Sequence, residues 1–159
     1  MKKNKEVNRD LIKVRSIANY QFGKNIGKML FPENSIIVKS KNTGKIRYIY
    51  YNNKLLATLR AKDGLLALTL DGAERILKVK TLRCKIKIKN EAAKYVIEGK
   101  NVFAKHVIEV NEDLRPQDEV IVVDEEDNLV AVGKAVLSGE EMKAFKHGVA
   151  VKVRRGKLN

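Results

Sequence analysis

Cysteine, histidine and tryptophan are scarce in this sequence. Its 159 residues include one cysteine, two histidines and no tryptophan. The single Cys84 excludes an internal disulfide. His106 and His147 stand in separate segments, so a zinc site, which combines several Cys and His ligands, is not expected. We therefore expect neither a metal nor a cofactor, and we interpret Cys84 as a buried, unreactive thiol.

Long apolar runs are absent as well. No segment approaches the roughly 20 consecutive apolar residues that a membrane-spanning helix needs. Four of the first six residues are charged, but no apolar core of a signal peptide follows them. The sequence therefore predicts a cytoplasmic protein that does not enter a membrane.

Acidic residues are few in the first half of the chain. The whole sequence holds 33 Lys and Arg against 19 Asp and Glu, a net charge of +14. Residues 1–83 hold 19 of the cations and 6 of the acids, whereas residues 84–159 hold 14 and 13. Nucleic acid is the favoured partner, because cations that neutralise phosphates release condensed counterions. A merely solvated basic surface and an anionic membrane are the weaker alternatives.

The first thirty residues have a helical period. Apolar positions recur at spacings of three and four, which predicts one apolar stripe with cations beside it. The predicted stripe consists of Leu11, Ile12, Arg15, Ala18 and Phe22. Gly23 divides the segment into two helices, residues 8–22 and 26–31, and Pro32 ends the second.

Residues 35–69 change to the alternation of strands. The predicted strands are 36–39, 46–51, 55–60 and 65–69. Asn42–Gly44 and Asn52–Asn53 join them as tight turns, because Asn and Gly tolerate a positive φ. Asp71 and Glu74 have the spacing of a capping box that opens a helix through Leu77. The first 80 residues thus predict an antiparallel sheet with helices on one face.

Residues 84–159 predict short strands and two short helices. The predicted strands are 84–89, 102–108, 119–124, 129–137 and 149–155. Asn90 is placed to cap the first helix and Gly99 to close it. Ser138 and Glu141 form a capping box for the second helix, which Gly148 ends. These elements favour a small closed or half-closed barrel, so the chain as a whole is predicted to be α+β.

Four motifs in the second half resemble a known RNA-binding module. They are Glu98–Lys105 (EGKNVFAK), Arg115–Val120 (RPQDEV), Val130–Met142 (VAVGKAVLSGEEM) and Gly148–Arg155 (GVAVKVRR). In this order and spacing they are similar to the PUA domain, a small barrel named for pseudouridine synthases and archaeosine transglycosylases. The resemblance implies RNA binding and no chemistry of the module's own.

The first half resembles the domain that precedes PUA in archaeal tRNA-guanine transglycosylase. The matching motifs are Val14–Gly23, Leu30–Glu33, Thr43–Arg47 and Leu56–Gly64. The resemblance implies two domains, a basic α+β pre-PUA domain over 1–80 and a PUA domain over 84–159. In that family the reaction belongs to a large barrel with an aspartate nucleophile and a zinc site, which one cysteine and two histidines cannot supply.

The sequence departs from this family at two positions. Asn19 stands where an acidic residue is expected before Tyr20, which could alter a helix contact. Gln117 follows Pro116 where glycine is common, and this predicts a type I turn in place of type II.

The resemblance to PUA domains implies an RNA-binding surface with two sides. One side consists of Gly99, Lys100, Phe103, Ala104 and Lys105, and the other of Lys143, Lys146, His147, Gly148, Val149 and Arg154. Glycine allows close approach of the backbone, and Lys or Arg can neutralise phosphates. The alternatives are that the glycines only end helices, that the lysines are only solvated, and that Phe103 belongs to the core and does not stack on a base.

The helices of the first half offer further cations for the RNA backbone. They are Lys13, Arg15, Lys24 and Lys28. The acidic clusters Glu109–Asp113 and Asp124–Asp127 could supply paired carboxylates for acid–base chemistry. Asp and Asn are, however, common in turns such as Asp124–Asp127, so no catalytic residue is expected.

These patterns predict a non-catalytic RNA-binding protein. The expected RNA is tRNA, and the chain could assist a separate tRNA-modification enzyme. The alternative is a protein-interaction subunit of a tRNA-modifying complex, in which RNA contact is secondary.

Overall fold

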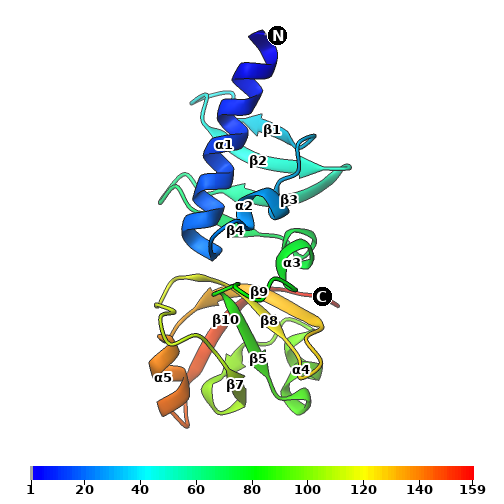
Figure 1. The fold of residues 1–159 in the computed structure, drawn as a ribbon. Coiled ribbons are helices and arrows are strands. Elements are labelled where there is room, and N and C mark those ends of the chain that lie inside the picture. The colour runs from blue at the N-terminus through cyan, green and yellow to red at the C-terminus, as the bar shows by residue number, and fades with distance from the viewer. Residues whose placement is uncertain (1) are drawn as a thin grey trace. The chain divides into compact units, whose positions relative to one another are not determined.

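The chain forms two compact units, which divide between Thr81 and Leu82. The structure is a computed structural model that describes the backbone of residues 2–159 and the side chains of residues 9–159. Figure 1 shows both units coloured along the chain. Each unit has its own sheet, and the two are described in turn as the first unit and the second unit.

Two helices open the first unit, α1 (Lys2–Phe22) and α2 (Ile26–Leu30). The buried stripe of α1 consists of Leu11, Val14, Ala18 and Phe22. The prediction of Ile12 in this stripe was wrong, because Ile12 is exposed. Residues 11, 14, 18 and 22 share one helical face, and position 12 lies about 100° away from Leu11.

The contact between α1 and α2 is made at the level of the backbone. Gly27 lies so close to the carbonyl oxygen of Arg15 that a Cβ atom at this position would overlap with it. Its backbone N–H donates a hydrogen bond of 2.7 Å to Oδ1 of Asn19. Asn19, one of the two departures from the family pattern, therefore holds the start of α2 against α1.

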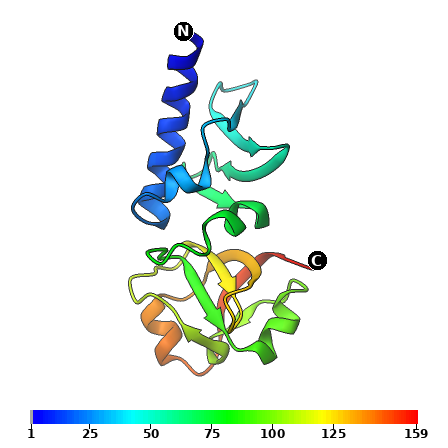
Figure 2. The same cartoon turned by 45° about the vertical axis from the view of Figure 1, so that its right-hand side comes forward.

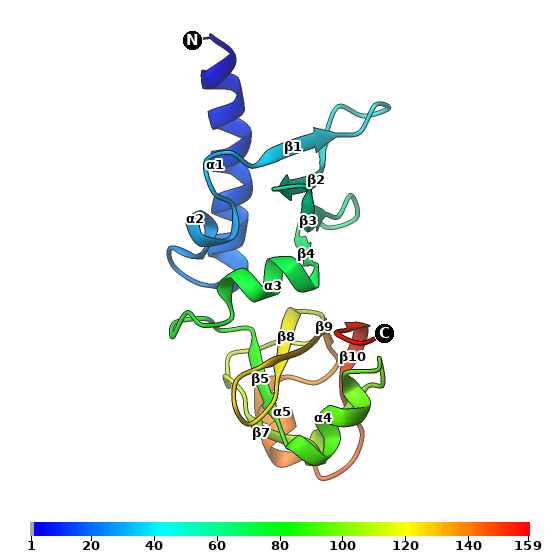
Figure 3. The same ribbon diagram turned by 90° about the vertical axis from the view of Figure 1, so that its right-hand side faces the viewer.

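Four antiparallel strands follow in the order β1-β2-β3-β4. Their bounds are β1 Ile36–Lys39, β2 Ile46–Tyr51, β3 Lys54–Leu59 and β4 Leu66–Leu68. Helices α1 and α2 lie on one face of this sheet (Figures 2 and 3). Asn52 and Asn53 both have positive φ, 49° and 64°, which confirms the predicted tight turn between β2 and β3.

The end of α1 is joined to the edge strand β4 by a side chain. The amide of Gln21 accepts a hydrogen bond of 2.6 Å from the backbone N–H of Leu66 and donates one of 3.1 Å to its carbonyl oxygen. Gln21 therefore satisfies both backbone groups that a neighbouring strand would bind.

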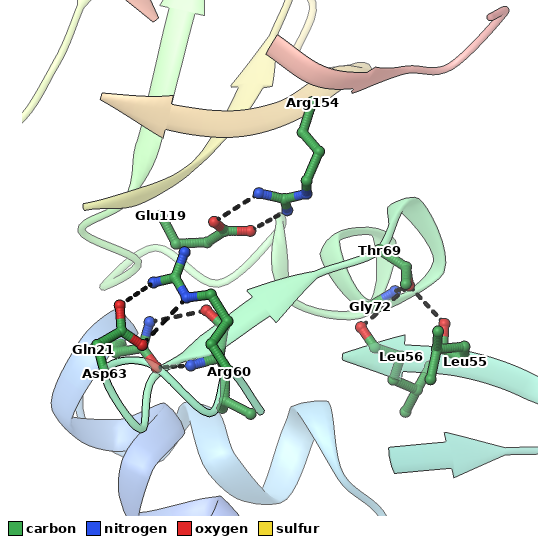
Figure 4. A network of polar contacts seen from close by, with 10 residues as sticks. Gln21, Leu55, Leu56, Arg60, Asp63, Thr69, Gly72, Glu119 and Arg154 are labelled. Carbon is green, nitrogen blue, oxygen red and sulfur yellow. Dashed lines mark hydrogen bonds and ion pairs between the residues drawn. The ribbon is translucent and has the colours of Figure 1, made fainter. Parts of the chain in front are cut away.

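Helix α3 (Leu70–Ile76) begins two residues earlier than the predicted capping box requires. The N-cap is Thr69, whose hydroxyl accepts a hydrogen bond of 3.1 Å from Gly72 N and donates one of 2.6 Å to the carbonyl oxygen of Leu55 (Figure 4). The capping box predicted for Asp71 was wrong, because Asp71 already lies inside the first turn, where its charge favours the helix N-terminus.

The second unit contains a nearly closed, barrel-like sheet of six strands in the order β6-β10-β9-β8-β5-β7. The strand bounds are β5 Lys85–Ile88, β6 Val102–Phe103, β7 Val107–Glu109, β8 Glu119–Val123, β9 Leu129–Ala135 and β10 Val149–Gly156. Only the β5–β8 pair is parallel. Aliphatic side chains such as Ile86, Val120 and Val151 fill the interior. The predicted α+β class is confirmed.

Helices α4 (Asn90–Val96) and α5 (Gly139–Ala144) accompany this sheet. The capping box of α5 is confirmed, because Ser138 Oγ accepts from Glu141 N at 3.1 Å and Glu141 Oε1 accepts from Ser138 N at 2.9 Å. The cap predicted for α4 was wrong. Asn90 lies inside the helix, and its side chain contacts Glu125 and Glu126 in the turn between β8 and β9.

A short 3-10 helix, η1 (Ala104–His106), interrupts the strand predicted over residues 102–108. The turn after Arg115 also differs from its prediction. Gln117 has φ +76°, and Asp118 N donates to the carbonyl oxygen of Arg115 at 3.1 Å. These features define a type II turn, although its third position is not glycine.

The strained turn yields a stability prediction. The substitution Gln117→Gly should stabilise the second unit by about 0.5–1 kcal/mol. Glycine adopts a positive φ without steric cost, and this gain exceeds the larger entropy that glycine loses on folding. Hydrogen exchange of β8 and β9 amides measures the free energy of unfolding of this unit. Gln117→Ala is the control, with no expected gain. A lower stability of the glycine variant would contradict the argument.

Candidate nucleic-acid interface

A hollow of about 580 Å³ lies beside α4 in the second unit. Its polar and aromatic lining consists of Glu91, Lys94, Tyr95, Lys100, Asn101, Phe103, Lys105 and His106. Three of the predicted RNA-binding residues, Lys100, Phe103 and Lys105, therefore share one concave surface. We call this surface the α4 groove.

The chain reversal after α4 shapes the groove. Gly99 has φ +104°, a conformation that favours glycine. The N–H groups of Gly99 and Lys100 donate to the carbonyl oxygens of Val96 and Tyr95, at 2.9 Å and 3.3 Å. These bonds end α4 and hold Lys100 beside the last turn of the helix.

Two aromatic rings in the groove are exposed. Phe103 is 47% exposed and Tyr95 is 57% exposed. The neighbouring Val102 points into the core, so Phe103 projects outward from β6. Phe103 is thus not a core residue, and both rings are accessible to flat ligands such as unpaired bases.

Lysines surround these rings. Lys94, Lys100 and Lys105 are exposed, and no carboxylate of the described residues forms an ion pair with any of them. Lys94 Nζ lies 5.2 Å from the centre of the Tyr95 ring, within cation–π range. The groove therefore combines aromatic faces with lysines that form no ion pair among the described residues, and its lining also includes the carboxylate of Glu91.

His106 contributes a neutral group to the groove. Burial and the neighbouring Lys105 lower the pKa of its imidazole, so the ring is uncharged at neutral pH. Its Nδ1 atom is buried, and no described residue hydrogen-bonds to it.

The second predicted side of the surface adjoins the first through strand pairing. Val149 of β10 pairs with Phe103 of β6, and the carbonyl oxygen of Gly148 accepts a hydrogen bond of 2.9 Å from Ala104 N. Gly148 has φ +94°. Ala104 is buried, and its N–H and C=O groups bond to Gly148 and Val107, whereas Lys146 and His147 are exposed. Lys143 is exposed as well, 3.2 Å from Glu112.

Arg154 differs from the other predicted contacts. Its guanidinium binds the carboxylate of Glu119 through two hydrogen bonds, one of them 3.0 Å from Nη1 to Oε1 (Figure 4). The side chain of Glu119 is fully buried. Arg154 thus neutralises a carboxylate of the core, and phosphate binding by Arg154 stays a prediction.

The cations predicted on the helices of the first unit also fall into two groups. Lys13, Lys24 and Lys28 are exposed. Arg15 is mostly buried, donates from Nε to the carbonyl oxygen of Phe31 at 2.8 Å, and pairs with Glu33 at 3.3 Å. Arg15 therefore links α1 to the end of α2, whereas the three lysines point to solvent.

The acidic loop after β8 is a structural turn. Oδ1 of Asp124 accepts hydrogen bonds from the N–H groups of Glu126 and Asn128, at 3.0 Å and 2.9 Å. Asp127 lies 3.2 Å from Lys87, and this hydrogen bond holds the pKa of the carboxyl below its usual range. These carboxylates therefore stabilise the loop and its contact with β5.

Other kinds of site find little support in the part of the chain that the structure describes. No group of three or more His, Cys, Asp or Glu side chains there could hold a metal ion. No helix within these residues is long and apolar enough to cross a membrane. Cys84 is buried, and burial raises the pKa of its thiol.

Comparison with known families matches almost the whole chain. Residues 12–81 match the patch-forming domain C2 of tRNA-guanine transglycosylase, and residues 84–157 match the PUA domain. The tRNA-guanine(15) transglycosylase of Methanothermobacter thermautotrophicus is 44% identical over 92% of this chain and 23% of its own length. That of Methanocaldococcus jannaschii is 38% identical over 98% of this chain and 24% of its own length. The chain thus spans about a quarter of the length of these relatives.

Solved structures agree on the fold. A hypothetical protein of Pyrococcus horikoshii superposes with a TM-score of 0.76 and 20% identity, over 95% of this chain and 92% of that one. A conserved PUA domain protein of Thermoplasma acidophilum superposes with a TM-score of 0.67 and 16% identity, over 98% and 91%. The barrel is therefore of the PUA type.

The pairing of Arg154 with Glu119 predicts a structural role. Arg154→Met should lower the free energy of unfolding of the second unit by about 2–3 kcal/mol, because a buried carboxylate loses its bidentate partner. The double variant E119L/R154M should be less destabilised, because both charges are gone. Hydrogen exchange of β8 amides measures both. Unchanged stability of Arg154→Met with a loss of RNA affinity would instead assign Arg154 to phosphate binding.

Proposed function

We propose that this chain, which joins a patch-forming domain C2 of tRNA-guanine transglycosylase to a PUA domain, is a tRNA-binding protein. The relatives that share both parts are tRNA-guanine transglycosylases, so the RNA best supported by similarity is tRNA. The observation that carries the proposal is the α4 groove, in which exposed rings stand among lysines that form no ion pair with any described residue.

The chemistry of the groove suits an unpaired nucleotide. Tyr95 and Phe103 can stack only on bases that are not already stacked in a helix, so a loop or a single-stranded end is the preferred element. Lys100 and Lys105 line the same hollow, and we assign to them the phosphates beside such bases. The positive charge of the whole chain adds affinity that depends on salt and not on sequence.

The proposal assigns no catalytic step to this chain. The similarity is to the C2 and PUA domains of the transglycosylases and not to a catalytic domain. The role that follows is to hold tRNA for a separate tRNA-modification enzyme. A complementation assay tests it: such an enzyme should gain activity on tRNA when this chain is added, and no gain would leave RNA binding as the whole function.

Charge reversal in the groove tests RNA binding. The variant K100E/K105E should bind bulk tRNA at least about tenfold more weakly, and the slope of log Kd against log salt should fall by about 2, because two phosphate contacts are lost. The measurement is a titration of labelled tRNA at several salt concentrations, with duplex DNA of similar length in parallel. Wild-type protein should prefer tRNA.

A matched variant controls for net charge. K62E/K157E carries the same change of charge, but both lysines lie outside the groove, so its affinity should stay close to that of wild type. Equal losses in the two variants, or equal binding of tRNA and duplex DNA, would show that only general charge attracts the RNA.

A further inference from the structure

The sheet of the first unit has one covered face and one open face. Cross-strand partners share a face, and the row Ile37–Ile49–Ala57 lies on the side of the core. The opposite face carries the rows Val38–Tyr48–Thr58 and Ile36–Tyr50–Leu55. No helix of the first unit, within its described residues, lies on this side (Figure 3). We call it the open sheet face.

Apolar and aromatic side chains are exposed on the open sheet face. Ile36 is 60% exposed and Tyr48 is 38% exposed. The rings of Tyr48 and Tyr50 have centroids 6.5 Å apart and planes inclined by 51°, so they do not stack on each other. Tyr48 therefore keeps an accessible ring beside the half-buried Tyr50, and an exposed apolar cluster of this kind indicates a binding surface.

Charge on the strands selects the kind of ligand. None of the four strands contains an acidic residue. Of their three cations, Lys39 pairs with Asp10 of α1 at 3.1 Å and Lys54 with Asp71 at 3.8 Å, which leaves Arg47 for a ligand. The guanidinium of Arg47 lies 6.0 Å from the centre of the Tyr48 ring, beside the exposed aromatic cluster. The excess of cations in residues 1–83 opposes a second copy of this chain and favours a polyanion.

We propose that the open sheet face is a second RNA-binding surface, which takes an unpaired stretch of RNA. Bases stack on Tyr48 and Tyr50, and Arg47 binds the adjoining phosphate. Some four-stranded sheets bind single-stranded RNA in this way, through aromatic side chains on one face. The inference rests on the proposed function, since it assumes that the chain binds RNA, and it adds a site outside the PUA domain.

Three variants separate ring stacking from other effects. Y48L/Y50L keeps the apolar area and removes the aromatic faces, whereas Y48F/Y50F keeps the rings. Tyr20→Leu removes a highly exposed tyrosine of α1, which lies on the other side of the sheet. The probes are unstructured oligo-uridine RNA and a short RNA duplex, and each variant is first checked for a wild-type melting temperature.

Only the variant without rings should lose affinity. Y48L/Y50L should bind oligo-uridine about tenfold more weakly, because base–aromatic stacking contributes about 1–3 kcal/mol per base. Its affinity for the duplex should not change, and the other two variants should resemble wild type. Ultraviolet cross-linking of oligo-uridine to the wild-type chain should modify the peptide that contains Tyr48, a result that requires no variant.

Other outcomes would refute the inference, and they separate its failure from a failure of the proposed function. Wild-type affinity of Y48L/Y50L with loss of binding in K100E/K105E would refute the open sheet face but retain the α4 groove. Unchanged RNA binding with loss of a protein partner would make this face a protein-docking surface. Absence of any RNA binding by the wild-type chain would refute the proposed function itself.

Discussion

The candidate interface of the second unit depends on one short strand pairing, that of β6 with β10. Strand β6 has only two residues, yet Phe103 pairs with Val149, and Ala104 N donates to the carbonyl oxygen of Gly148. This pairing brings the segment after α4 beside the segment after α5, although about 45 residues separate them. Because each backbone group of a buried strand needs a partner, the two halves of the surface are held together by the same bonds that close the sheet.

The sequence predicted the regular elements well, because they follow from periodicity. The alternation over residues 36–69 and the stops at Gly23 and Pro32 correspond to the observed strands and helices. Local polar contacts were harder to predict. Thr69 and Asp71 are both good N-cap residues, and only the bond from Thr69 to the neighbouring strand decides between them. Asn90 bonds to a hairpin 35 residues away, which no local pattern reveals.

The candidate site was also predicted only in part, because contacts between residues distant in the sequence leave no local pattern. Lys100, Phe103 and Lys105 were selected through the family resemblance, and the structure places them in one groove. The sequence could not assign Phe103 to core or surface. It predicted one continuous strand over 102–108, whereas η1 interrupts this strand directly after Phe103. Lys94 and Tyr95 were missed. Their spacing from Gly99 places them on the last turn of α4, and this was the available signal.

The bond of Gln21 to Leu66 has a consequence for association between molecules. An edge strand with free N–H and C=O groups can pair with a strand of another molecule and start aggregation. At β4 the amide of Gln21 occupies the backbone groups of Leu66 with the geometry of one more strand. Helix α1, which covers the sheet, therefore also protects its edge strand β4. The first unit should resist edge-to-edge strand pairing at this edge.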